Sequence, residues 1–370
     1  MNKKIHLICL LLVSNTCFIL CQPVWQVSES NLPEPVNLAY LHNAGGGVFW
    51  GIGLKGDFSK QLWEYDESYS YILRTTNSGS SGVWNKSRFP VDSNIIGSLS
   101  AKNFTKAWLV TYDLAAKTSR VWRTLNGGST WQPLEIGITN SSYLNVIQMW
   151  SLTKGVVVGD PVNGKFEIFK TTNGGAYWLK TENTPASEKD EIGLICISYA
   201  FGKSLYMPTT TGRLLYTKDM GDTWNVCKTP LSFAEFMSFK TDDDGIIALN
   251  DYSVYPFKTQ ISHTTDGGKT WSSPTNSDFA FFDVKYIPNS NTLIGTTRER
   301  NDIGPFRTIV SEDDGLTWTT IETGTPIASF NITEEGIGLG GMFKNDNSTS
   351  TTKIYRFNLP ESISLRPIRQ

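Results

Sequence analysis

Several features that would point to common activities are scarce in this sequence. Lysine and arginine number 33 against 35 aspartate and glutamate residues, so the formal net charge is −2. That balance gives no electrostatic basis for binding nucleic acid or an anionic membrane. The chain has three histidines and five cysteines, none at the spacing of a zinc site. It has no Gly-x-Ser-x-Gly motif and no phosphate-binding loop, so we predict neither a metal nor a cofactor.

Long apolar runs are also missing, except at the N-terminus. Lys3 and Lys4 precede an apolar stretch over residues 5–20 that three polar residues interrupt. The stretch is broken and short for a membrane span, and no later segment reaches about 18 apolar residues. The pattern predicts a signal peptide over residues 1–21 and secretion of residues 22–370, with a retained anchor as the alternative.

A motif of the form Ser/Thr-x-Asp/Asn-x-Gly-x-x-Trp recurs along the chain, with a longer turn in its first copy. Its tryptophans follow one another at intervals of 46 or 47 residues, from Trp84 to Trp318. A fixed period of this length marks a repeat architecture, which also accounts for a chain longer than the roughly 250–300 residues that one core usually serves. The acidic or amide members of the motif are Asn77, Asn126, Asn173, Asp219, Asp266 and Asp313.

The chemistry of the motif predicts a tight turn between two antiparallel strands. The Asp or Asn oxygen can accept hydrogen bonds from turn N–H groups, the glycine can adopt a positive φ, and the tryptophan can pack against the hairpin. Each unit contains four short strands, A to D, expected in the third unit over residues 146–151, 155–159, 166–171 and 177–182. Four antiparallel strands at this period are typical of one blade of a β-propeller.

The ends of the chain decide the number of blades. Six motifs give six blades, and three more strands are expected over residues 328–333, 336–342 and 353–357. The missing fourth strand is expected from the N-terminus, where Trp25-Gln26-Val27 resembles Trp131-Gln132-Pro133. We therefore predict an all-β fold: a single seven-bladed β-propeller of four-stranded antiparallel blades, closed by the N-terminal strand. Six or eight blades are the alternatives.

The motif resembles the Asp box, or BNR repeat, of sialidases, sortilin-type receptors and photosystem II assembly factor-like propellers. The resemblance to secreted propellers of the last type rests on Val157-Val158-Gly159-Asp160-Pro161, which runs into the box at Thr171. It covers nearly all of residues 22–370 and implies a fold more than an activity. A sialidase would also need an arginine in a Phe/Tyr-Arg-Ile-Pro motif before the first box. The first arginine here, Arg74, adjoins that box, so sialidase activity is not expected.

In a propeller the D–A and B–C loops share one face, and the boxes lie on the other. An insertion over residues 56–69 adds aromatic and acidic side chains to the loop face, a combination that suits contact with a sugar or a protein. Its alternative role is packing over the neighbouring blade. The candidate ligand-binding residues of this face are Trp63, Tyr65, Asp160, Glu235, Asp278, Arg298 and Arg300.

The remaining reactive side chains are interpreted as structural. His42, expected in an A–B turn, and His263, just before a box, fit surface or structural roles. Cys196 and Cys227 are expected in strands A and D of one blade, roughly 14 Å apart by strand spacing. A disulfide needs Cα atoms within about 7 Å, so two unpaired, mostly buried thiols are predicted. N-glycosylation sequons occur at Asn85, Asn103, Asn140, Asn331 and Asn347.

These observations favour a secreted, monomeric propeller that serves as a binding or scaffold module for a protein or glycan ligand. The alternative is a carbohydrate-active enzyme of the glycoside hydrolase type, in which two carboxylates of the loop face act as acid and base.

Overall fold

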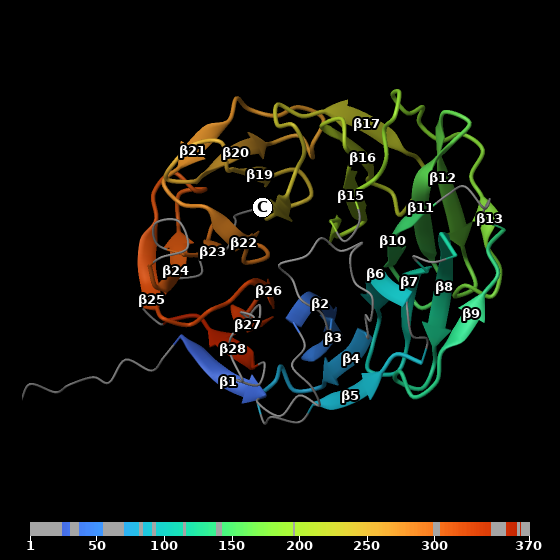
Figure 1. The fold of residues 1–370 in the computed structure, drawn as a ribbon, viewed down its shortest axis with the longest axis horizontal. Coiled ribbons are helices and arrows are strands. Elements are labelled where there is room, and N and C mark those ends of the chain that lie inside the picture. Colours follow the sequence, from blue (N-terminus) through green and yellow to red (C-terminus); the bar gives the residue numbers. More distant parts are fainter. Residues whose placement is uncertain are drawn as a thin grey trace, which may run out of the picture.

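A computed structural model describes residues 24–29, 37–54, 70–80, 84–90, 94–113, 116–137, 143–194, 197–298, 304–341, 353–360 and 363. Within these ranges every regular element is a β-strand, and the strands form seven four-stranded antiparallel sheets around a central channel (Figure 1). The predicted seven-bladed propeller is therefore confirmed. Among the described residues no helix has the length and apolar character needed to cross a bilayer. The expected signal peptide lies outside the described residues.

Each blade runs from strand A at the channel to strand D at the rim. In blades 1 to 4 these strands are β2 (Asn37–Gly45), β3 (Val48–Leu54), β4 (Ser70–Thr75) and β5 (Asn85–Arg88); β6 (Asn94–Ala101), β7 (Ala107–Asp113), β8 (Thr118–Thr124) and β9 (Gln132–Leu134); β10 (Leu144–Met149), β11 (Gly155–Val162), β12 (Lys165–Thr171) and β13 (Leu179–Lys180); and β14 (Tyr199–Phe201), β15 (Ser204–Pro208), β16 (Arg213–Thr217) and β17 (Asn225–Lys228). In blades 5 to 7 they are β18 (Phe236–Phe239), β19 (Gly245–Asp251), β20 (Lys258–Thr264) and β21 (Thr275–Ser277); β22 (Phe281–Tyr286), β23 (Leu293–Arg298), β24 (Phe306–Ser311) and β25 (Thr319–Thr323); and β26 (Ser329–Ile332), β27 (Ile337–Gly341), β28 (Ile354–Asn358) and β1 (Trp25–Glu29).

The hydrophobic core lies between blades. One cluster joins Trp50 and Ile72 of blade 1 to Leu99 and Leu109 of blade 2, and another joins blade 3 to blade 4 in the same way. Central strands are buried on both faces because each sheet has a neighbour on either side; all but the last residue of β7 are buried. The blades depend on one another for burial, as expected of a propeller.

The repeated Ser/Thr-x-Asp/Asn-x-Gly motifs, called boxes below, close the hairpins between strands C and D, as the sequence predicted. In blade 5 the hydroxyl of Thr264 donates to Asp266 Oδ1 at 2.9 Å, and the same oxygen accepts from the Thr270 N–H at 2.9 Å. The Gly268 N–H in turn donates to Thr264 Oγ1 at 2.8 Å. Burial acts to raise the pKa of Asp266, but the hydrogen bonds from Thr270 and Thr264 outweigh it and hold the pKa at about 2.

Five of the six boxes are also tied to the A–B turn of their own blade. The residue before the box glycine has a positive φ in all six copies, +72° at Gly267 and +60° at Met220, for example. In five of them its N–H donates to a carbonyl of the A–B turn, as from Gly267 to Asp243 and from Met220 to Lys203. The same bond joins Ser78 to Gly47, Gly127 to Thr105 and Gly174 to Thr153. The boxes and the A–B turns therefore share one face, which leaves the D–A and B–C loops on the other.

The ring of blades closes through the N-terminal strand, as predicted. β1 pairs with β28, with Trp25 opposite Phe357, and Figure 1 shows these two strands side by side in blade 7. The Trp25 indole packs 5.0 Å from the Phe357 ring and donates from Nε1 to Thr308 Oγ1 of blade 6 at 2.8 Å. On the other side, Ser28 Oγ donates to the Gly79 carbonyl of blade 1 at 2.6 Å. One strand thus links blades 6, 7 and 1.

Cys227 lies in strand D of blade 4 and is a free thiol, as predicted. Burial raises the pKa of this thiol. Cys196 lies outside the described residues.

Replacing the carboxylate of one box will separate its hydrogen-bonding role from its charge. We expect Asp266→Ala to lower the free energy of unfolding by about 1–2 kcal/mol, because three hydrogen bonds lose their acceptor. Asp266→Asn, the residue type of the first three boxes, should retain most of that free energy at pH 7. Urea denaturation at pH 7 measures both, and equal losses for the two variants would contradict the hydrogen-bonding role.

The contribution of the Asp266 charge should be visible in the pH dependence of the free energy of unfolding. The native pKa of Asp266 lies below the usual value of about 3.9, so its contribution is present above pH 4 and is lost as the pH falls towards 2. Asp266→Asn should lack that part of the acid destabilisation.

Removing the tryptophan of β1 should weaken the whole ring. Trp25→Ala is expected to cost about 3–5 kcal/mol, because the indole is buried between blades 6 and 7. Trp25→Phe, which retains an aromatic ring, should cost less, and Val27→Ala on the exposed side of the same strand should cost little. Chemical denaturation followed by fluorescence measures all three. If the Trp25→Ala variant had the same denaturation midpoint as the wild type, β1 would not be needed to close the ring.

Candidate functional site

The candidate site is the central channel together with its mouth on the loop face. The channel encloses a cavity of about 500 Å³ that is lined by residues of all seven blades. Most of them belong to the A strands, since these strands stand closest to the axis. A volume of this size lies within the range of small-molecule sites.

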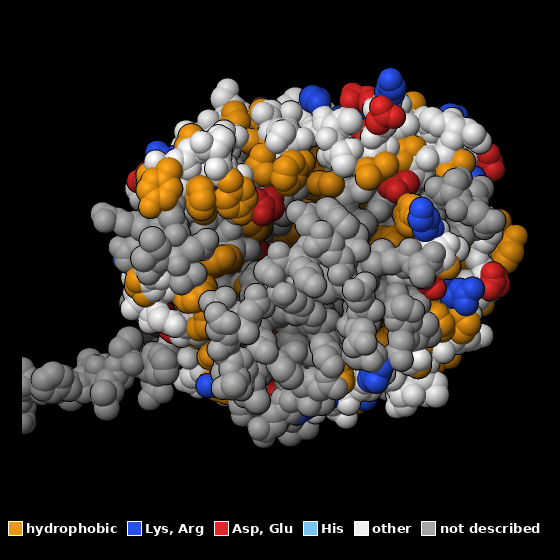
Figure 2. All heavy atoms as spheres, viewed as in Figure 1, with side chains coloured by type: hydrophobic (Ala, Val, Ile, Leu, Met, Phe, Trp, Pro, Cys, Tyr) orange, Lys and Arg blue, Asp and Glu red, His pale blue; other side chains and the backbone are white. Residues whose placement is uncertain are grey.

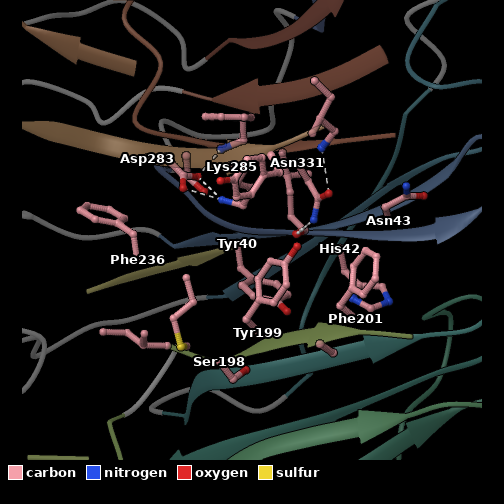
Figure 3. A pocket seen from close by; sticks show the side chains of 18 of the residues that line it. Tyr40, His42, Asn43, Ser198, Tyr199, Phe201, Phe236, Asp283, Lys285 and Asn331 are labelled. Atoms are coloured by element: carbon pink, nitrogen blue, oxygen red, sulfur yellow. Dashed lines mark hydrogen bonds and ion pairs between the residues drawn. The ribbon is translucent and has the colours of Figure 1, made fainter. Parts of the chain in front are cut away.

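One wall of the cavity carries an ion pair within blade 6 whose carboxylate also binds blade 7. Asp283 of β22 is buried, pairs with the ammonium of Lys285, and accepts the N–H of Phe330 in β26 at 3.0 Å. Asn331 continues the chain of contacts by donating from Nδ2 to the Leu41 carbonyl of blade 1 at 3.0 Å. Figure 3 shows Asp283, Lys285 and Asn331 together on this side. Asn331 is also a predicted sequon, and its amide nitrogen is engaged here between two blades.

His42 of blade 1 also lines the cavity, as do Tyr199 and Phe201 of blade 4 (Figure 3). His42 lies within β2, so its predicted position in an A–B turn was wrong; the turn begins after Gly45. Its Nε2 lies 3.0 Å from the Ala101 carbonyl of blade 2. A carbonyl can only accept, so His42 must donate from Nε2 and leave Nδ1 as an acceptor. Desolvation in the channel, with repulsion from Lys102, lowers the pKa of His42 to about 4, although the Ala101 hydrogen bond raises it.

Asp160 of the Gly-Asp-Pro segment is buried at the contact between blades 3 and 4. Its Oδ1 accepts from Asn145 Nδ2 at 2.7 Å and from the Gly193 N–H at 2.9 Å. Burial raises its pKa, while those two hydrogen bonds lower it. A Cβ on Gly193 would stand 2.4 Å from Asn145 Nδ2, so the contact is close enough to require glycine. This geometry favours a structural role: Asp160 fixes the chain that enters blade 4.

Glu235 lies at the channel mouth, directly before β18, and lines the cavity. Its carboxylate accepts the Asn250 N–H at 3.1 Å. Burial raises the pKa of Glu235, and the contacts with Asn250 oppose that effect. Among the predicted face residues whose side chains the structure describes, Glu235 is the one that lines the cavity.

The other predicted face residues are not gathered around Glu235. Asp278 is exposed and lies 4.0 Å from the Lys258 ammonium, at the limit of an ion pair. Arg298 ends β23, where its backbone pairs with Phe306. Trp63, Tyr65 and Arg300 fall outside the described residues.

Sequence reasoning missed an aromatic hairpin on the loop face. The B–C turn of blade 5 carries Tyr252 and Tyr255, which are 61% and 74% exposed, and both contact the ring of Phe257 at 5.3 and 6.3 Å. Figure 2 shows hydrophobic side chains gathered over this blade. The signal was available: residues 251–257 combine three aromatics and an aspartate, the same kind of pattern that singled out residues 62–69.

Asn250 attaches this hairpin to the channel mouth. Besides donating its N–H to Glu235, it donates from Nδ2 to the Tyr252 hydroxyl at 3.1 Å and to the Phe281 carbonyl of blade 6 at 2.8 Å. Its Oδ1 accepts the Phe281 N–H at 3.0 Å. The exposed tyrosines therefore stand on a buried, fully bonded support next to the cavity.

The chemistry of the site is that of recognition by aromatic and charged groups. No group of three or more metal-ligating side chains occurs in the described part of the chain. Fold and site define a seven-bladed β-propeller with a cavity on its axis and an aromatic element on the loop face.

Comparison with known proteins finds structures of similar fold but no family for this chain. No family model and no curated protein matches the sequence. Among solved structures, YCF48 bound to D1 peptide has a TM-score of 0.59 at 14% identity, over 90% of this chain and 96% of that chain. YCF48 from Cyanidioschyzon merolae has a TM-score of 0.60 at 13% identity, over 92% and 99%.

A GH74 xyloglucanase from Xanthomonas campestris has a TM-score of 0.53 at 12% identity, over 90% of this chain and 55% of that chain. At these identities the likeness concerns the fold alone.

The histidine in the channel predicts a distinctive loss of stability in mild acid. The unfolded chain takes up a proton at His42 near pH 6.5, whereas the native pKa is about 4, so stability falls as the pH drops from 6.5 to 4. His42→Gln retains a donor for the Ala101 carbonyl but cannot titrate. The stability difference between wild type and His42→Gln should therefore shrink from pH 7 to pH 5 in thermal denaturation. A constant difference would contradict the assigned protonation state.

Proposed function

We propose that this protein is a secreted binding or scaffold propeller of the Asp-box, photosystem II assembly factor-like type. Its ligand, a protein or a glycan, docks on the loop face beside the channel mouth. The observation that carries the proposal is the aromatic hairpin of blade 5. Two tyrosines there remain in contact with water although they stand on the bonded support of Asn250, and rigid exposed aromatics of this kind are typical anchors of binding surfaces.

The structural neighbours are consistent with such a role. One of them, YCF48, was solved with a D1 peptide, and another is a xyloglucanase. Both ligand classes that the sequence favours, protein and glycan, thus occur on the same fold.

A second candidate function is hydrolysis of a glycan. The raised pKa of Glu235 favours it, because a carboxyl group that retains its proton can act as a general acid. Glu235 also stands at the mouth of a cavity. Asp160, the other carboxylate that the sequence singled out for this role, is engaged between blades 3 and 4.

Truncating the most exposed tyrosine will test the proposed surface. Wild-type protein is screened on a printed array of neutral and acidic glycans and against a displayed random peptide library. Tyr255→Ala should weaken the selected interaction about tenfold or more, as loss of an aromatic anchor does. Tyr177→Ala, which removes an equally exposed tyrosine from a box on the other face, should not.

Binding that survives Tyr255→Ala but not Tyr177→Ala would place the ligand on the box face and overturn the proposal. Turnover in a panel of glycoside hydrolase substrates, abolished by Glu235→Gln, would replace it with the enzymatic alternative.

A further inference from the structure

The hairpin between β19 and β20 ends in a turn that stands in water. All five residues over 252–256 are exposed. Tyr255 is the most exposed of them at 74%, and its ring meets the Phe257 ring edge to face, at 6.3 Å between centroids and 79° between planes. An edge-to-face contact with one neighbour occupies little of a ring, so Tyr255 has π surface to offer to another molecule.

Two carboxylates flank one ammonium at the base of this hairpin. Asp251, the last residue of β19, stands opposite Lys258, the first residue of β20. On the other side Asp278, directly after β21, lies 4.0 Å from the same ammonium, and its side chain is 91% exposed. The hydroxyl and the N–H of Ser253 donate to Asp251 Oδ1 at 2.5 and 2.9 Å and lower the pKa of Asp251. The base thus has two negative charges against one positive charge.

Elsewhere in the same fold, a ring and a carboxylate hold a cation together. The ammonium of Lys240 lies 5.4 Å from the centroid of the Tyr286 ring and 2.7 Å from Asp314 Oδ1. Lys285 stands in the same way between the aspartate that it pairs with and the ring of Phe330, which is 5.0 Å away. The ring attracts the cation through its quadrupole, and the carboxylate attracts it through its charge.

The hairpin of blade 5 presents this combination to the outside. The Tyr255 ring and the Asp278 carboxylate are both largely exposed, so a cation from another molecule can reach them. An acidic ligand would be repelled by the excess of negative charge, and a neutral one would gain nothing from it. The ring and the carboxylates belong to different strands of the blade, which favours a ligand of several residues over a small ion.

We propose that the blade 5 hairpin binds a basic segment of a protein partner. One arginine or lysine side chain stacks on the Tyr255 ring, and another faces the carboxylates of Asp251 and Asp278. Arginine suits both places, because its planar guanidinium stacks on aromatic rings and matches the two oxygens of a carboxylate. This inference rests on the proposed function, since it names the class of ligand for the same surface. The contacts are non-covalent and screened by salt.

Titration calorimetry with two matched peptides tests the inference. The probe is a capped peptide of three Gly-Arg repeats, and its counterpart contains citrulline, which has nearly the same shape without the charge, in place of each arginine. Wild-type protein should bind the arginine peptide about tenfold more tightly than the citrulline peptide. This preference should shrink between about 0.1 M and about 1 M salt, because the Debye length falls over that range.

Three variants separate the ring from the charge. Tyr255→Leu retains an apolar side chain but has no π surface, and should lower the preference for the arginine peptide about two- to fivefold, whereas Tyr255→Phe should retain most of it. Asp278→Asn should also lower the preference. Glu135→Gln is the matched control: it removes an exposed carboxylate that directly follows strand D of blade 2, and should behave as wild type.

Equal affinity of the wild type for the two peptides would overturn the inference, and so would a preference that persists unchanged in Tyr255→Leu. If Tyr255→Ala nevertheless abolished the interaction selected from the glycan array or the peptide library, the hairpin would bind a neutral ligand and the proposed function would stand. Equal losses for Asp278→Asn and Glu135→Gln would show attraction to the overall charge alone and would also overturn the inference.

Discussion

The structure depends on hydrogen bonds that cross from the innermost strand of one blade to the next. His42 reaches Ala101, Ser98 accepts the Ile147 N–H, and Tyr199 donates to the Phe239 carbonyl. Ser238, Asp283 and Asn331 extend the series around the channel. A blade alone has an apolar face on each side, and packing two such faces leaves their relative height free. The cross-blade bonds fix that height, because each pairs one side chain with one backbone group.

Those same bonds decide which channel residues remain available to a ligand. Several polar side chains that line the channel are already bonded to other groups of the protein. Glu235 accepts the Asn250 N–H at the base of the tyrosine hairpin, and Asp283 binds Lys285 and a backbone N–H of blade 7. A cavity with many polar side chains in its lining can therefore have few that are free to bind a ligand. The hydrogen-bond and ion-pair partners of each side chain must be known before it is given a role.

The sequence predicted the fold well because its signal is local. A box such as that of blade 5 needs only the residues between Thr264 and Trp271 to form its turn, and the same motif recurs at a regular spacing in six of the seven blades. Closure by Trp25 was also predictable, since the last blade lacked a strand and the first residues resembled one. The roles of Asp160 and His42 were not. Their partners, Gly193 and Ala101, lie on neighbouring blades. The sequence of one repeat does not specify how its strands align with those of the next blade. The hairpin at Tyr252 and Tyr255 was overlooked although its composition resembled that of the loop that was singled out.

Ring closure by β1 also determines the order in which the strands can pair during synthesis. Trp25 is made before the other described strands of the propeller, yet its N–H donates to Glu322, which lies 297 positions later, and its ring packs in the last blade. β1, the strand that completes the ring, must therefore remain unpaired while the other six blades form. Contacts between such distant segments form late and slowly, because closing a long chain segment costs entropy before the contacts repay it. The first described strand of the propeller to be synthesised is thus the last to pair, and the apolar flank of blade 7 stays exposed until it does.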